Sequence, residues 1–289
     1  MFKKSIIAVA LATFALAQGA KAQTNLQVFY DFAPDRQHVT TTLEGFYADN
    51  WGNTFFFIDH DYNSKAADNH VYAPSGTYWE IARCLNFWKD SQLADLSLHV
   101  EYNGGVYNGF TVNNAFLGGI DYFLHSPDFN NTLNIKLLGK YIDYAGAVSE
   151  MTGQLRKSLV PLQFTVVWGM QDLFNVKGLR FSGFADFWFE NHTVYRSFRT
   201  VQEEEEWWRR MEEQWREGNP DLEPGRSRET AMAWDSDVVF ISEPQLWYNV
   251  GQHIGVPILN VGGEVVLSFD FGTTLGFKAR PCLGVKWVF

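Results

Sequence analysis

The chain closes on the stretch FKARPCLGVKWVF, residues 277–289. Every second residue, beginning with Phe277, is apolar, whereas the residues between them include Lys278, Arg280 and Lys286. A period of two is that of a β-strand, in which successive side chains point to opposite faces. The stretch is therefore predicted to be a strand with one apolar face, and that face must lie against apolar material.

The same alternation recurs upstream, in runs separated by Gly, Asn, Asp and Pro residues. Residues 104–111 and 146–156 lack it and are predicted to be loops. Arg83 breaks the alternation of its run, so it requires a bulge or a position at a rim. About twelve strands are predicted, near 25–33, 38–49, 53–61, 76–88, 95–103, 113–125, 132–145, 158–170, 178–191, 237–249, 260–272 and 275–289.

Two environments suit such strands. In a soluble β-sandwich or a lipocalin-like barrel the apolar face is buried, whereas in a membrane barrel it meets lipid and the polar face lines the lumen. Most runs reach the roughly 9–11 residues that a tilted membrane-spanning strand needs. Aromatic residues near the run ends would form interfacial girdles, among them Trp51, Phe87, Trp88, Trp168 and Trp287. We therefore expect an all-β fold, a transmembrane antiparallel up-and-down β-barrel.

Composition excludes several other classes. The chain has 289 residues, 46% of them hydrophobic and 17% aromatic, with only 19% charged. This combination excludes a coiled coil, a collagen and a disordered chain. The formal net charge of −10 argues against a nucleic-acid polymer as partner. Two cysteines, Cys84 and Cys282, do not make a disulfide scaffold and are expected to be free thiols.

The first residues predict export. Lys3 and Lys4 precede the apolar run IIAVALATFAL, and Ala20-Lys21-Ala22 resembles a signal-peptidase site. The run is shorter than the roughly 17 residues of a spanning helix, so a membrane anchor is disfavoured. Residues 1–22 are predicted to be a signal peptide and residues 23–289 the barrel.

The predicted location is the outer membrane of a double-membraned bacterium. Outer-membrane lipid would surround the barrel, since the apolar faces of its strands need an apolar solvent. The barrel-assembly machinery is a second expected partner, through the closing strand that ends in Phe289. No cofactor is expected.

The residues on the polar face of each strand are predicted to line the lumen. Carboxylates outnumber cations there, and aromatic rings accompany them, so the lining suits a flat, polar solute that stacks on rings and donates hydrogen bonds. Pairing of the lumen charges with one another, to keep a narrow barrel rigid, is the alternative role for any single residue. The candidate substrate-binding residues are Phe57, Asp59, Glu80, Glu101, Asp186, Trp188, Glu243, Trp247, Lys278 and Arg280. Trp247→Ala is expected to weaken solute block without unfolding the barrel.

Motifs of catalysis or metal binding are not expected. Asp59-His60-Asp61 could suggest a metal site, but alternation places His60 opposite the two aspartates. The pairing of His99 with Glu101 is a weak signal, and the chain contains no HExxH or GxSxG motif. We therefore predict no catalytic residue and no metal ligand. A barrel enzyme acting at the rim and a closed structural or adhesin barrel remain the alternatives to a channel.

Several segments resemble the Tsx-like nucleoside-specific channel-forming proteins of the outer membrane. The resemblance is carried by 55–59 (FFFID), 78–81 (YWEI), 99–102 (HVEY) and 285–289 (VKWVF). It implies a twelve-stranded barrel with a narrow channel that passes nucleosides by stacking them on lumen aromatics. The lining positions that it implies are Phe57, Asp59, Glu80 and Glu101. Residues 242–249 and the insertion 200–235 have no counterpart, as in a separate branch of that family.

The insertion 200–235, between the ninth and tenth predicted strands, is expected to hold a helix at the extracellular side. Thr200 and Glu203 form a capping box, and three Glu→Arg pairs at i,i+4 follow in the favourable order. Gly218-Asn219-Pro220 would end the helix. Its tryptophan-bearing face is expected to cover the barrel mouth as a lid, with a mobile surface helix as the alternative. Deleting residues 201–233 would then raise the single-channel conductance.

Overall fold

The computed structural model describes residues 21–62, 74–107, 110–144, 160–196, 198, 201–218 and 233–289. The predicted signal peptide, apart from Lys21 and Ala22, and the predicted loop 146–156 lie outside these ranges.

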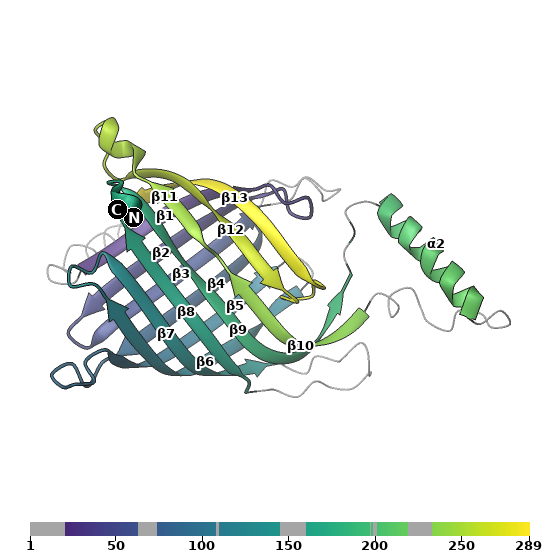
Figure 1. Cartoon of the computed structure of the whole chain (residues 1–289), viewed down its shortest axis with the longest axis horizontal. Helices are drawn as coiled ribbons and strands as arrows, with labels where there is room; N and C mark the ends of the chain where they lie inside the picture. Colours follow the sequence, from purple (N-terminus) through teal and green to yellow (C-terminus); the bar gives the residue numbers. More distant parts are fainter. Residues whose placement is uncertain are drawn as a thin grey trace, which may run out of the picture.

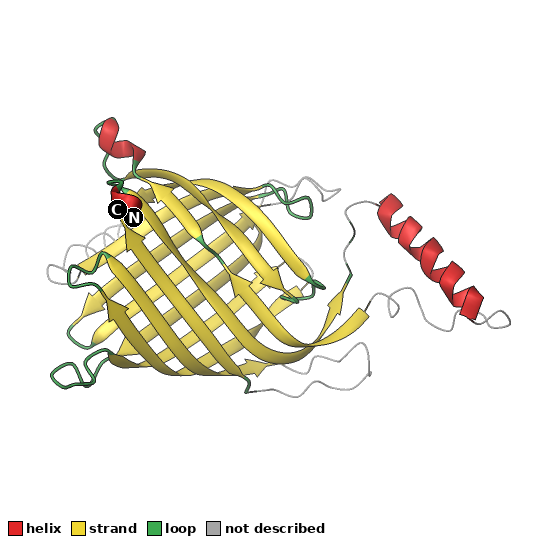
Figure 2. Ribbon diagram, viewed as in Figure 1, coloured by secondary structure: helices red, strands yellow, loops and turns green. Residues whose placement is uncertain are grey.

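A single antiparallel sheet of thirteen strands closes on itself to form a barrel (Figures 1 and 2). Consecutive strands pair with each other, except that β10 and β11 each pair with β9 and β12, and β1 pairs with β13 to close the wall. The strands are β1 (Lys21–Asp31), β2 (Val39–Asp49), β3 (Gly52–Tyr62), β4 (Pro74–Leu85), β5 (Leu96–Tyr107), β6 (Phe110–His125), β7 (Asn131–Asp143), β8 (Leu162–Gln171), β9 (Leu179–Tyr195), β10 (Ala233–Ser242), β11 (Gln245–Tyr248), β12 (Leu259–Phe269) and β13 (Phe277–Val288).

β10 and β11 share one place in the wall. Both pair with β9 and β12, and the register on each side continues unchanged from β10 to β11. Pro244 lies between them and has no N–H to donate, so the ladder lacks one hydrogen bond there, although Glu243 N donates to Phe184 O and Pro244 O accepts from Val265 N. Gly183 faces the break on β9, where an added Cβ would lie 2.4 Å from the carbonyl oxygen of Glu243. The barrel therefore has the twelve strand positions predicted, but the prediction of one continuous strand over 237–249 was wrong.

The predicted loop at 104–111 was also wrong. β5 continues to Tyr107 and β6 begins at Phe110, so strand structure covers most of this segment. Gly104 and Gly105 obscured the alternation, and the register of β5 against β6 shifts between Asn103 and Gly105. A bulge adds a residue to one strand and so interrupts the period of two.

The alternation places the two faces as predicted. Along β13 every second residue from Phe277 is exposed, whereas the intervening residues include the buried Arg280, Cys282 and Lys286. Because the sheet is closed, the covered face is the inside of the barrel, which we call the inner face. The outer face carries exposed large apolar side chains on most strands, for example Val100, Phe116 and Leu283. A closed barrel with such an exterior is built for the hydrocarbon of a bilayer, and this protein is an outer-membrane β-barrel.

The two ends of the barrel differ. Both termini lie at one end, which we call the terminal end, and α2 (Val201–Gly218) projects from the other, the helix end (Figure 1). At the terminal end the connections include the 3-10 helices η1 (Leu173–Asn175) and η2 (Val250–His253). In outer-membrane barrels the short turns face the periplasm. None of the helices in the described ranges is both long and apolar enough to cross a membrane.

α2 confirms the predicted helix, but it is not a lid. Figures 1 and 2 show it beyond the helix end, clear of the barrel. Trp207 contacts Phe198, with ring centroids 5.6 Å apart, and the Arg196 guanidinium lies 5.5 Å from the ring centroids of both Trp207 and Trp234. The described aromatic contacts of the helix are thus made with its own connecting segments. The expectation of a mouth-covering helix was wrong.

Two further expectations concern single residues. Arg83 points to the outer face and lies near the rim of the terminal end, where its Nη2 is 2.8 Å from Asp49 Oδ1 and its Nη1 donates to Thr54 at 3.1 Å. The predicted rim position is therefore confirmed. Cys84 and Cys282 are both free and buried, as expected.

Candidate functional site

All ten candidate substrate-binding residues lie on the inner face. Their positions follow from strand alternation and from contacts with other inner-face residues, and no described contact tests whether they bind a solute. Six come from the middle of the wall or its terminal half, namely Phe57, Glu80, Glu101, Asp186, Glu243 and Trp247. Asp59, Trp188, Lys278 and Arg280 lie nearer the helix end.

The inner carboxylates are held mainly by neutral donors. Thr42 Oγ1 donates to Asp59 Oδ1 at 2.5 Å, and Tyr78 donates its hydroxyl to Glu80 Oε1 at 2.6 Å. Asp186 accepts a hydrogen bond from Thr165 Oγ1 at 2.6 Å in the same way.

Glu264 follows this rule, because it accepts a hydrogen bond from Gln245 Nε2 at 2.8 Å. Glu243 lies two residues before Gln245 on the same face. Glu101 is the exception, because it contacts His99 Nε2 at 2.8 Å. We call Asp59, Glu80, Asp186, Glu243 and Glu264 the acidic belt.

Members of the acidic belt form no ion pair within the described ranges. The ion pairs found there join other residues, such as Arg36 with Asp31 and Arg280 with Asp35. A carboxylate offers about four acceptor sites, and one neutral donor uses one of them. The belt therefore keeps acceptor capacity directed into the barrel.

A lysine ammonium group already lies over the ring of each of the two tryptophans that were predicted to stack on a solute. Lys140 Nζ lies 3.6 Å from the ring centroid of Trp188, and Lys286 Nζ lies 4.3 Å from that of Trp247. Trp247 also contacts Phe29, with ring centroids 5.5 Å apart, and is only 1% exposed. These cation–π contacts anchor the lysines against the wall, so neither ring offers a bare face.

A better stacking surface lies on β3 and β4. Phe57 and Tyr78 are half-buried, and their ring centroids are 5.9 Å apart. Phe55 extends the group, since its centroid lies 6.1 Å from that of Phe57. These rings adjoin Asp59 and Glu80 of the acidic belt, because inner-face residues on one strand are two positions apart. An aromatic surface thus stands beside carboxylate acceptors.

The loop 32–38 between β1 and β2, which we call the inner loop, was missed at the sequence level. Its side chains reach inner-face residues of three strands at the helix end. Arg280 Nη2 on β13 donates to Asp35 Oδ2 at 2.8 Å, and Arg280 Nε donates to the same atom at 3.1 Å. The loop is short and its sequence has no repeating hydrophobic pattern, so only its charged residues could have suggested this role.

Two further contacts hold the inner loop. Arg36 Nη1 lies 3.4 Å from Asp31 Oδ2 on β1, and His38 Nε2 lies 3.4 Å from Asp61 Oδ1 on β3. Burial raises the pKa of the Asp35 carboxyl, but the hydrogen bond and the charge of Arg280 outweigh it and hold the pKa below its usual value. Asp35 is therefore ionised near neutral pH. The inner loop is tied to β13 and β1 by ion pairs and to β3 by the contact of His38 with Asp61.

Comparison with solved structures finds outer-membrane proteins. The NanC porin is 7% identical with a TM-score of 0.49, over 91% of this chain and 98% of that one. OprD from Pseudomonas aeruginosa is 9% identical with a TM-score of 0.35, over 94% of each chain. OccAB3 from Acinetobacter baumannii is 9% identical with a TM-score of 0.34, over 94% of this chain and 99% of that one. None of the three is described as a nucleoside channel, and likenesses this distant carry no conclusion about a pore.

Comparison with curated proteins gave no match. Residues 23–289 match one protein family, a span that covers every described strand from residue 23 onward. The chain belongs to the family described as a domain of unknown function, DUF5020.

Proposed function

We propose that the protein is a passive, substrate-selective channel of the outer membrane for small polar solutes, with nucleosides as the solute class. The observation that carries the proposal is the acidic belt, whose carboxylates face the interior without ion-pair partners in the described ranges. Such a lining attracts cations and hydrogen-bond donors and repels anions.

The solute class rests on the neighbouring rings and on the resemblance to Tsx-like channels. A nucleoside has a flat base that stacks on an aromatic ring and a sugar whose hydroxyls donate hydrogen bonds. Phe57 and Tyr78 supply the rings, and Asp59 and Glu80 supply acceptors beside them. A phosphorylated nucleoside carries negative charge and would be repelled by the acidic belt.

Swelling of liposomes that contain the folded full-length barrel tests the proposal. Adenosine should enter faster than adenosine monophosphate, because the two differ mainly in the phosphate. Adenosine should also enter faster than a neutral disaccharide of comparable mass, because the disaccharide lacks a stacking base.

Variants connect this transport to the site. Phe57→Ala should reduce adenosine entry while leaving the exclusion of adenosine monophosphate intact. Phe164→Ala is the matched control, since Phe164 is an exposed residue of the outer face. Equal entry of adenosine and adenosine monophosphate would contradict the proposal that the acidic belt repels phosphorylated nucleosides. Absence of swelling with every solute would instead favour a closed structural barrel.

A further inference from the structure

Three chemically distinctive side chains meet on the inner face near the terminal end. Cys84 of β4 lies directly opposite His99 of β5 in the strand register. On β6, Gly119 is the partner of His99, so Asp121 is its diagonal neighbour two residues further on. Diagonal neighbours on one face of a sheet are within side-chain reach. The antiparallel register thus brings together residues that are far apart in the sequence.

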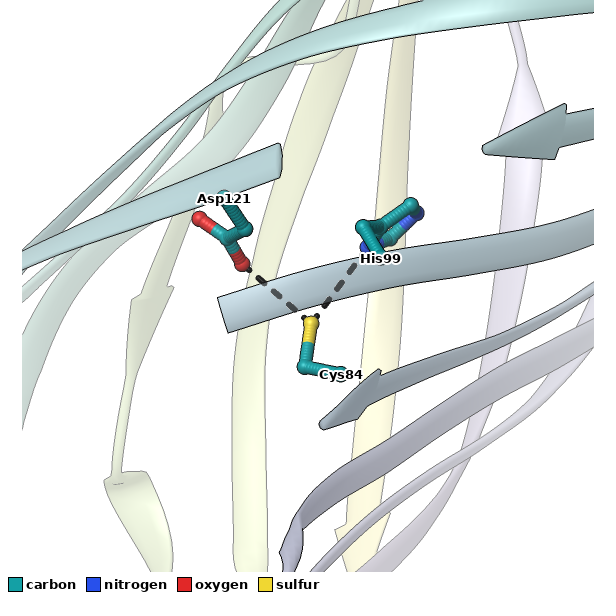
Figure 3. Close-up of side chains that lie close together, drawn as sticks. All are labelled: Cys84, His99 and Asp121. Carbon is teal, nitrogen blue, oxygen red and sulfur yellow. Dashed lines mark hydrogen bonds between the residues drawn. The ribbon is translucent and has the colours of Figure 1, made fainter. Parts of the chain in front are cut away.

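The three side chains converge on one another, as Figure 3 shows. Cys84 Sγ lies 3.3 Å from His99 Nδ1 and 3.2 Å from Asp121 Oδ2. The three donor atoms all lie within 4.8 Å of one another. Cys84, His99 and Asp121 are 4%, 1% and 3% exposed, so the cluster is shielded from bulk solvent. Two ligands of a tetrahedral zinc site, with bonds of about 2.0–2.3 Å, lie roughly 3.2–3.8 Å apart. The two spacings from the sulfur fall in this range.

Two further residues hold the cluster in place. Glu101 Oε2 lies 2.8 Å from His99 Nε2 and accepts its hydrogen in the neutral imidazole. That tautomer leaves the lone pair of Nδ1 directed at Cys84. Asn134 Nδ2 lies 2.9 Å from both carboxylate oxygens of Asp121. A carboxylate behind a ligating histidine and a hydrogen bond to a ligating carboxylate are the usual supports of metal ligands.

The charges distinguish a metal site from a catalytic nucleophile. A nucleophilic cysteine works as a thiolate and needs a positive environment. Here Asp121 is 3.2 Å from the sulfur, so a thiolate would face a carboxylate. Lys136 is opposite Asp121 in the register, but these two described residues form no ion pair. A divalent cation between sulfur and carboxylate removes the repulsion, because the ion, a thiolate and a carboxylate together are neutral.

We propose that Cys84, His99 and Asp121 bind one divalent transition-metal ion of the Zn²⁺ class. On binding, the Cys84 S–H bond breaks, its proton leaves to solvent, and the thiolate forms the bond to the metal. His99 coordinates through neutral Nδ1 and Asp121 through Oδ2, so one proton is released for each ion bound. The thiolate, imidazole and carboxylate set suits Zn²⁺ and Co²⁺, whereas Mg²⁺ and Ca²⁺ prefer oxygen ligands alone.

The site differs from the proposed solute path in its location and its chemistry. It ties β4, β5 and β6 together within the wall near the terminal end, whereas the stacking rings lie on β3 and β4. The metal proposal does not depend on transport, so a barrel that conducts nothing could still bind the ion. Because the ligands are buried, the ion is best supplied while the barrel folds.

Cobalt provides a direct readout, because a Co²⁺–thiolate bond gives a charge-transfer absorption in the near ultraviolet. The full-length chain is refolded in detergent with Co²⁺ and separated from free metal. The wild type should retain one Co²⁺ per barrel, show this absorption, and release Co²⁺ on exchange with Zn²⁺. Cys84→Ser should abolish the absorption, and Glu101→Gln should weaken binding about 10- to 100-fold.

Cys282→Ser is the matched control. Cys282 is the other free, buried cysteine, and its Sγ donates to the backbone oxygen of Arg280 at 3.9 Å. This variant should keep the full absorption. No absorption in the wild type, or equal absorption in Cys84→Ser, would overturn the proposal.

Alkylation of the wild type covers the case in which Cys84→Ser does not fold. Zn²⁺ should slow iodoacetamide labelling of Cys84 at least 10-fold and leave Cys282 labelling unchanged. Rapid labelling of Cys84 in metal-free protein without protection by Zn²⁺ would identify a nucleophile instead, and would overturn the metal assignment.

Discussion

Trp247 shows that an inner-face residue can stabilise the barrel wall by packing against neighbouring strands. Its ring contacts Phe29 on one side of the closing seam, carries the ammonium of Lys286, and donates through Nε1 to Gln245 at 2.9 Å. The alternation of β11 predicted the direction of the side chain, but these neighbours come from β1 and β13. A single-strand pattern contains no information about them.

Trp247→Ala is therefore expected to destabilise the barrel more than it alters solute block. Removal of a large buried aromatic typically costs about 3–5 kcal/mol. The measurement is urea unfolding in lipid vesicles, followed by the loss of the heat-resistant form. Trp51→Ala is the control, because Trp51 is 64% exposed in a turn and should change stability little. Equal stabilities of the two variants would show that Trp247 is not a packing residue.

The acidic belt depends on inward placement, which period-two alternation predicted for each of the ten candidate residues. Which inner residues touch one another could not be predicted in the same way. Contact depends on the stagger between neighbouring strands, and a shift by two residues preserves the faces while changing every partner. This is why the cluster of Cys84, His99 and Asp121 was missed although each lies on the inner face.

At the scale of elements, the inner loop carries a contact that depends on pH. Asp35 has a folded-state pKa below its usual value because of Arg280. A depressed carboxyl pKa contributes stability above the unfolded pKa, and that stability is lost as pH falls through the folded pKa.

Asp35→Asn is expected to remove this contribution. The pair is partly exposed, so the loss near neutral pH should be at most about 1 kcal/mol, and it should vanish well below the ordinary carboxyl pKa of about 3.9. Urea unfolding in vesicles at several pH values measures the difference from wild type. The control is Asp90→Asn, at an exposed position in the turn before β5. A difference between Asp35→Asn and wild type that does not change with pH would contradict the role of Asp35.

α2 illustrates the limit of local signals. Its capping box and charge pairs predict a helix and say nothing about where that helix lies. In the structure its Trp207 contacts Arg196 and Phe198 of the connecting segment, which the local pattern of the helix does not predict. Pro244 likewise predicts an interruption of the ladder, yet the long alternating run around it predicts one strand.

Deletion of residues 201–232 should leave the single-channel conductance unchanged, because α2 stands clear of the mouth (Figure 1). A heat-resistant barrel should still form, since the wall contacts of β9 with β10 are retained. Planar-bilayer recording of the deletion variant beside the wild type makes the comparison. An increase in conductance after deletion would support the hypothesis that α2 covers the barrel mouth.

For the whole molecule, closure of the sheet separates two surfaces with opposite chemistry. The outer face is apolar and meets lipid, while the inner face concentrates carboxylates whose described partners are mostly neutral donors. Closure could be predicted from the long alternating strands and the apolar closing face. The surplus of carboxylates inside is the property on which the proposed selective transport rests.

The most direct test is the reversal potential of single channels in a planar bilayer across a KCl gradient. The wild-type barrel should show small, discrete conductance with preference for K⁺ over Cl⁻, reduced by added adenosine. Glu80→Gln combined with Asp186→Asn should weaken the cation preference, whereas Asp90→Asn should leave it unchanged. A heat-resistant wild-type barrel that conducts nothing, or that prefers Cl⁻, would contradict the account.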